Sequence, residues 1–272
     1  METLKYNYAN KAFSPKIVHK PAGLAHHHLN SPLGIGMIKK YKFIQEAANA
    51  VKIAAEESAS AVLSQHAKIQ GHEEEITAQL KYEITKEFVN RVQANLNGKV
   101  IHGVQFAAQV FSRTQESNVG ADLMGVLQID TPTGSVQKGF LAQAKVCDSG
   151  TDSWGNPIAI CYDSNSRLRG QVEDMLSLTP DSFAFFYTAE GVFVVPAFQI
   201  NLTSGNRIST DEIYAHRIGP FYEEHFKCFI GDQRIAPPST SPGDLEQQSE
   251  ELSEKANHVL SIQAKLPLEL DF

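Results

Sequence analysis

The stretch that decides the fold is ADLMGVLQIDTPTGSVQKGFLAQAKVC, residues 121–147. Two apolar runs of strand length flank the turn-forming residues 130–135, a pattern that predicts an antiparallel hairpin. In a hairpin that is symmetric about this turn, residues whose numbers sum to 265 oppose each other, so Asp122 faces Gln143. Side chains alternate along a strand, which places Gln143 and Lys145 on one face. The hairpin therefore gathers a carboxylate, an amide and an ammonium group.

Lys145 lies in an otherwise apolar strand, so it needs a polar partner if it is buried. Two interpretations are open at this point. In the first, Asp122 and Lys145 form a structural ion pair at the end of a sheet. In the second, the three side chains form a functional site, because ionisable groups forced together are typical of such sites.

A helix is predicted before the hairpin, with apolar residues four apart from Ile76 to Ile84. Three consecutive glutamates precede this stripe. On a helical wheel only Glu73 falls within the stripe and faces the sheet, whereas Glu74 and Glu75 point away. Acidic residues at the start of a helix also interact favourably with its dipole, which accounts for Glu74 and Glu75 without any site.

The remaining pattern predicts helices and strands in alternation, an α/β chain. The expected helices are 37–70, 76–96, 168–176, 221–230 and one C-terminal helix carrying Leu245, Leu252, Ala256 and Val259; the expected strands are 100–112, 121–129, 138–147, 183–187 and 192–197. A polar loop is expected over residues 148–166 and a Pro/Ser-rich linker over 236–243. A second Gln-Ala-Lys, residues 263–265, falls at the end of the C-terminal helix and is interpreted as chance.

The composition excludes several classes of protein. The chain has 272 residues, of which 42% are hydrophobic and 20% charged, values typical of globular domains. Its three cysteines form no Cys-x-x-Cys pair, which indicates reduced thiols in a cytosolic protein. The chain starts without a signal-peptide pattern and has no run of apolar residues of membrane-spanning length, so we expect a cytoplasmic protein with no membrane partner.

Charge is distributed unevenly along the chain. The net charge of −7 includes eight lysines against two glutamates in residues 1–52, which gives that arm +6, whereas the central region is acidic. An acidic protein does not coat DNA by itself, because the phosphate backbone repels it. Any contact with DNA is therefore expected to depend on the basic arm, on oligomerisation or on a partner protein.

The order of these motifs resembles the PD-(D/E)xK nuclease superfamily. The matching residues are an acidic helix, Gly120-Ala121-Asp122 on one strand, Gln143-Ala144-Lys145 on the next, and the helix segment 171–176. The Gln-x-Lys form is similar to that of Mrr-type restriction enzymes, and the segment 171–180 resembles bacterial nuclease-like proteins associated with anti-phage defence. The chain departs from the pattern at Ala121, where the family has proline.

The resemblance implies a restriction-endonuclease-like αβα core with a mixed central sheet over residues 71–235, preceded by a basic arm and long helix (1–70) and followed by a linker and C-terminal helix (236–272). It also implies site residues. Asp122, Gln143 and Glu73 would hold Mg²⁺ or Mn²⁺, Lys145 would orient the attacking water, and Gln171 would be the polar residue of the following helix. Glu74, Glu75 and Glu116 are open alternatives to Glu73.

The expected function is accordingly a metal-dependent nuclease that hydrolyses DNA, in anti-phage defence or restriction. Partners, or further copies of the chain, are expected to bind through the helix at 37–70 and the C-terminal helix. The spacing of the first helix fits either a partner helix or packing on its own domain. The alternatives are a non-cutting interaction subunit with a nuclease fold and an RNase.

Overall fold

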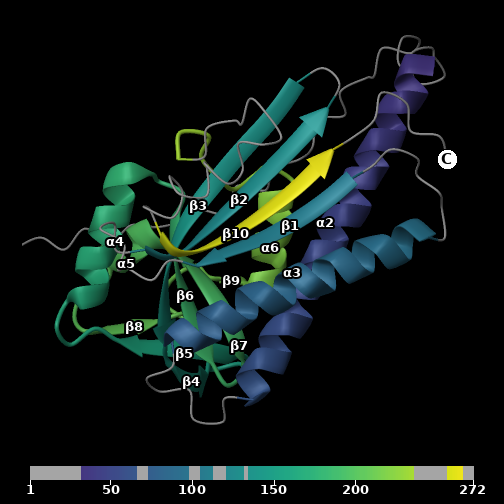
Figure 1. The fold of residues 1–272 in the computed structure, drawn as a ribbon. Coiled ribbons are helices and arrows are strands. Elements are labelled where there is room, and N and C mark those ends of the chain that lie inside the picture. Colours follow the sequence, from purple (N-terminus) through teal and green to yellow (C-terminus); the bar gives the residue numbers. More distant parts are fainter. Residues whose placement is uncertain are drawn as a thin grey trace, which may run out of the picture.

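A computed structural model describes residues 32–65, 73–97, 105–112, 121–131, 134–235 and 256–265 (Figure 1). The helices are α2 (Pro32–Gln65), α3 (Glu73–Asn97), α4 (Arg167–Leu178), α5 (Ala197–Leu202) and α6 (Ile218–Phe226). The strands are β1 (Gln105–Ser112), β2 (Ala121–Thr131), β3 (Gly134–Val146), β4 (Asp148–Thr151), β5 (Pro157–Tyr162), β6 (Ser182–Thr188), β7 (Gly191–Pro196), β8 (Arg207–Ser209), β9 (His216–Arg217) and β10 (Ala256–Lys265). The chain is therefore an α/β protein, as the sequence predicts.

A seven-stranded mixed sheet forms the centre, in the order β1-β10-β2-β3-β6-β7-β9. β10 runs parallel to β2 and β3 runs parallel to β6, and the other neighbours are antiparallel. Helices α2, α3 and α6 pack on one face of the sheet and α4 and α5 on the other, where a small sheet of β4, β5 and β8 also lies (Figure 1). Helices cover both faces, which gives the layers of an α/β sandwich.

The β2–β3 hairpin forms with the predicted register. Leu123 pairs with Ala142, and Thr131 pairs with Gly134 at the turn, so paired residue numbers sum to 265 throughout. The strands form here because alternate residues face two separate cores: Leu123 and Leu127 face α2 and α3, whereas Met124 faces α4.

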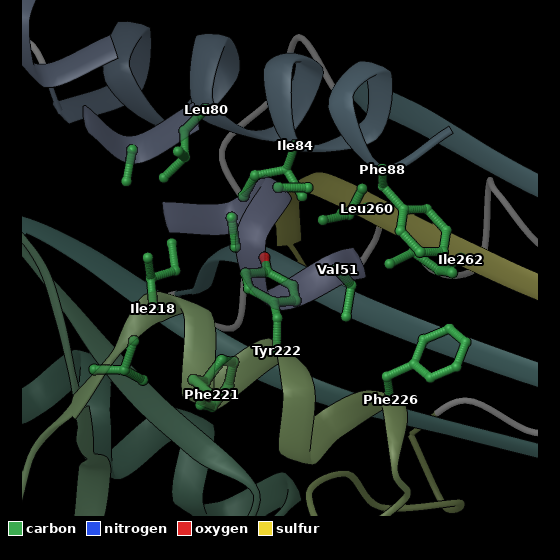
Figure 2. Close-up of a cluster of buried hydrophobic side chains, with 14 of the residues drawn as sticks. Val51, Leu80, Ile84, Phe88, Ile218, Phe221, Tyr222, Phe226, Leu260 and Ile262 are labelled. Atoms are coloured by element: carbon green, nitrogen blue, oxygen red, sulfur yellow. The ribbon is translucent and has the colours of Figure 1, made fainter. Parts of the chain in front are cut away.

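The first core lies under α2, α3 and α6. Figure 2 shows side chains from α3, α6 and β10 converging there, with Val51 of α2 among them. The predicted stripe of α3 is part of this core, since Ile76, Leu80, Ile84 and Phe88 are all buried. Burying this stripe fixes which side of α3 faces the sheet, and therefore which side chains of its first turn point toward the sheet.

Helix α2 packs on its own chain. Its side chains from Phe43 to Leu63 contribute mainly small residues to the first core. Lys52 pairs with Glu223 of α6 at 2.8 Å, and Glu56 accepts a hydrogen bond from the Gly219 N–H at 3.0 Å. Of the two interpretations of this helix, packing on its own domain is confirmed for the described side chains.

The predicted C-terminal helix is wrong over residues 256–265, which form β10, an interior strand paired with β1 and β2. Both faces of β10 are almost fully buried, and Val259 and Ile262 are β-branched residues suited to that setting. The spacing that suggested a helix is local, whereas the pairing joins segments more than a hundred residues apart. The segment thus lies within the same sheet as the hairpin.

The predicted polar loop over residues 148–166 is wrong over β4 and β5, which pair there, whereas residues 152–156 and 163–166 are turns and loop as predicted. β4 reads Asp-Ser-Gly-Thr and has no strand pattern of its own. It forms because it continues from β3 and pairs with the apolar β5. In β5, Cys161 is buried in the second core, which lies under α4 and α5, and Ile158 is also buried. All three cysteines are free thiols, as predicted.

Candidate functional site

The predicted site residues meet at one edge of the large sheet. β2 and β10 begin at this edge, β3 and β6 end there, and the parallel pairing of β3 with β6 brings Lys145 beside Phe186. Helix α3 begins at Glu73, close enough for an ion pair with Lys145. Three elements thus supply the polar groups of one small region.

Asp122 occupies the centre of this region. Its Oδ2 accepts hydrogen bonds from the Ala144 N–H, at 3.0 Å, and from the side-chain amide of Gln143. The pKa of Asp122 is raised to about 6, chiefly by burial and to a smaller extent by Glu73 and Glu74, against the opposing effects of the Ala144 hydrogen bond and the Lys145 charge. A carboxylate that is desolvated this strongly favours a bound cation.

Gln143 is 5% exposed, and only its nitrogen is satisfied. Nε2 donates to Asp122 and, at 3.2 Å, to the Ala144 carbonyl. Facing a carboxylate fixes the amide orientation, because an oxygen there would be repelled. Its Oε1 is buried and accepts no hydrogen bond in the part of the chain that the structure describes. A buried acceptor without a donor is costly, which makes this oxygen a candidate ligand.

Lys145 and Glu73 face each other across the edge of the sheet. The distance from Lys145 Nζ to Glu73 Oε1 is 3.9 Å, and both side chains are about one-third exposed. Glu74 and Glu75 are more exposed, as the helical wheel predicts. Among the described residues the ion pair of Lys145 is with Glu73, so the simple Asp122–Lys145 pair of the structural interpretation does not form.

The first turn of α3 is held by a buried hydroxyl pair. Thr77 donates to the Glu73 carbonyl at 2.7 Å, and its Oγ1 lies 2.9 Å from the hydroxyl oxygen of Tyr187 at the end of β6. Tyr187 is fully buried, and burial raises its pKa, so the phenol stays neutral. The pair links the start of α3 to the sheet just below Glu73.

Among the described residues, the predicted Gln171 does not join the site. Gln171 is half-buried on α4, whose buried face is formed by Leu168, Val172 and Met175, and within the described ranges no hydrogen bond links it to Asp122, Gln143 or Lys145. Glu116 lies outside the described residues.

Asn257 of β10 is a site neighbour that the sequence did not indicate. Its Nδ2 lies 3.5 Å from Asp122 Oδ1, because the parallel register pairs Ala256 with Ala121 and His258 with Leu123. No motif marks this residue, and the segment has a helical pattern. Tyr187 was also missed, although a tyrosine that ends a strand of apolar residues is a usable signal for a buried hydroxyl contact.

The donor set fits a hard cation with few protein ligands. It comprises the carboxylates of Asp122 and Glu73 and the unsatisfied carbonyl oxygen of Gln143. Mg²⁺ typically takes one or two carboxylates and keeps several waters. The described residues hold no group of three or more His, Cys, Asp or Glu side chains arranged for a metal, so an all-carboxylate cage is not what this site offers.

Comparison with protein families, with curated proteins and with solved structures finds no match to this chain. None of the helices in the described ranges has the length and apolar character to cross a membrane.

Proposed function

We propose that this protein is a metal-dependent nuclease that hydrolyses phosphodiester bonds in DNA, with a restriction-endonuclease-like fold. The observation that carries the proposal is the meeting of Asp122, Gln143 and Lys145 on one hairpin end with Glu73 from α3. The order of α3, the β2–β3 hairpin and α4 along the chain, with other strands between them, and the helices on both faces of a mixed sheet support the fold assignment.

In this proposal Asp122, Glu73 and the Gln143 carbonyl oxygen hold Mg²⁺ or Mn²⁺. When bound, the metal supplies Lewis-acid polarisation of the phosphate and a more acidic water. The Ala144 N–H and the Gln143 amide hold the Asp122 carboxylate in place. Lys145, which reaches the solvent-accessible side of the edge, orients the attacking water and stabilises charge on the phosphate oxygens.

The acidity of the chain limits how it meets DNA. With a net charge of −7, we expect weak binding of the isolated chain to duplex DNA at physiological salt. Engagement through the basic residues of the arm, a second copy or a partner protein stays a prediction, because residues 1–31 lie outside the described residues. A role in anti-phage defence or restriction, and a cytoplasmic location, are part of the same proposal.

A specific observation favours one alternative, a non-cutting interaction subunit that keeps the nuclease fold. Gln143 stands where the family places a carboxylate, and a neutral amide binds a cation more weakly. The described acids form no cluster of three. If the metal is not held tightly enough for catalysis, the same residues are only a remnant of the site.

The test is cleavage of plasmid DNA, of short duplexes and of RNA with Mg²⁺ or Mn²⁺. Wild type is compared with Asp122→Asn, Lys145→Met and Glu73→Gln. Asp130→Asn is the matched control, since it changes the same kind of residue on the same strand, at the turn end. We expect losses of about 10²-fold or more for the three site variants and none for the control.

The outcomes separate the candidates. Equal cleavage by wild type and all variants means a contaminating nuclease and overturns the site assignment. Cleavage of RNA alone with the same variant profile makes the protein an RNase. Absence of cleavage together with a stable protein complex supports the interaction subunit. Glu75→Gln, compared with Glu73→Gln, decides which helix acid completes the site.

A further inference from the structure

A buried pair of basic side chains joins α3 to β10. Lys81 and His258 are 3% and 4% exposed, and Lys81 Nζ lies 2.8 Å from His258 Nδ1. Burial lowers the pKa of Lys81 to about 8, and burial together with the Lys81 charge lowers the pKa of His258 to about 4. At neutral pH the arrangement is an ammonium donating to a neutral imidazole.

The pair is not needed to attach the helix. The apolar stripe of α3 from Ile76 to Phe88 already packs against the sheet. Replacing a buried ionic or polar pair by apolar side chains of similar volume is often neutral or stabilising, so stability alone does not explain its presence. A directional hydrogen bond does what apolar contacts do not: it fixes the rotation and the axial position of the helix.

The contacts of β10 lead from this pair to both acids of the site. His258 contacts α3 through Lys81, which lies about two turns along the helix from Glu73. Its neighbour Asn257 points to the opposite face and has its amide nitrogen 3.5 Å from Asp122 Oδ1. Two consecutive residues of one strand thus contact the helix that carries one acid and the side chain of the other.

We infer that Asn257 and His258 of β10 are positioning residues that set the placement of Glu73 relative to Asp122, with Lys81 holding His258 in register. The inference rests on the proposed function, since it concerns the same two acids. It adds a strand to a site otherwise built from a helix and a hairpin. The site then requires β10 to be inserted between β1 and β2.

The test uses the full chain with the double substitution Lys81→Met/His258→Leu, which replaces the polar pair by apolar side chains of similar size. Ile84→Val is the matched control, because it trims a buried residue of the same helix that has no link to the acids. Mn²⁺ affinity is measured by calorimetry, stability by thermal unfolding, and the order of α3 by amide hydrogen exchange. Asn257→Leu is measured in parallel.

We expect the double variant to unfold at or above the wild-type midpoint while its Mn²⁺ dissociation constant rises about tenfold or more, as for other residues that orient metal ligands. Exchange at the amides of residues 73–77 should become faster. Asn257→Leu should weaken Mn²⁺ binding by a similar factor, and Ile84→Val should leave it unchanged.

Wild-type Mn²⁺ affinity in both the double variant and Asn257→Leu overturns the inference. So does a loss of affinity that Ile84→Val shares, because the role would then be structural only. If the double variant does not fold, Asn257→Leu decides alone. If wild type binds no Mn²⁺ and cuts nothing, the proposed function fails, but the positioning of α3 is still tested by hydrogen exchange. Faster exchange at residues 73–77 in the double variant then supports that positioning. Unchanged exchange overturns it.

Discussion

Two regions of the β2–β3 hairpin bury side chains of opposite character: one buries apolar rings in close contact, and the other buries polar groups. Phe140 packs among other rings: Phe221 and His225 lie edge-on with centroids 4.9 Å away. A Cβ at Gly125, directly opposite, would come within 2.1 Å of the Phe140 ring, so glycine makes room for it. A few residues along the same strands, Asp122 is a desolvated carboxylate and Gln143 keeps an unsatisfied oxygen.

The difference shows which region was shaped by packing and which was not. Complementary contacts lower the free energy of the native state, whereas a buried carboxylate with a raised pKa and an unused acceptor raise it. Local violations of this kind are expected at functional sites, with stability supplied elsewhere. The aromatic core is therefore expected to dominate stability, and the edge to contribute little or to oppose it.

The largest expected effect is in the core. Phe140→Ala should lower the free energy of unfolding by roughly 3–5 kcal/mol, because it leaves a cavity among rings that do not collapse onto it. Urea unfolding measures this. Val136→Ala on the same strand, where the side chain is 38% exposed, is the control and should cost far less. A loss below about 1 kcal/mol for Phe140→Ala would mean that the core is not tightly packed.

The second effect is a pH dependence of the same core. Burial lowers the pKa of His225 to about 4, so the folded state keeps it neutral while the unfolded chain takes up a proton below about 6.5. The stability that neutral His225 contributes to the folded state is fully present above about pH 6.5 and is lost as the pH falls toward 4. Wild type should therefore lose roughly 2 kcal/mol through this residue between pH 7 and 5, and His225→Leu should abolish that part of the slope. An identical slope in the variant contradicts the assignment.

The third effect has the opposite sign and lies at the edge. The pKa of Asp122 is raised, so above pH 6 its ionised form destabilises the folded state, and this cost falls as the carboxylate is protonated. Asp122→Asn should therefore stabilise the metal-free protein by about 1–2 kcal/mol at pH 7, while removing Mn²⁺ binding. Asp130→Asn should give no such gain. A clear loss of stability in Asp122→Asn would show that the edge is packed like the core.

The smallest effect concerns the hydrogen bond that joins the start of α3, beside the site, to the sheet. Tyr187→Phe removes the hydroxyl that meets Thr77, and should cost about 1 kcal/mol, with a similar cost for Thr77→Val. In the double variant the costs should not add, because the partners remove one shared bond. Fully additive effects in chemical denaturation would show that this hydrogen bond does not hold α3 to the sheet.

Part of the site could be predicted because its signals are local. The hairpin turn fixes the register, so the contact between Asp122 and Gln143 follows from counting along the chain. The side of α3 that carries Glu73 follows from the apolar period. The placement of Gln171 was carried over from the resemblance alone, and no contact with the site supports it. Asn257 and His258 had no local signal at all.

The sequence by itself determined the hairpin, its register and the face of α3, because strand alternation, turn chemistry and helical period act over a few neighbouring residues. Only the tertiary structure decided that residues 256–265 form a strand and that this strand enters the sheet beside Asp122. Its partner β2 lies more than a hundred residues away, and burial on both faces overrides a weak helical pattern. Pairing between strands so far apart in the chain produces no periodic pattern in the sequence from which it could be predicted.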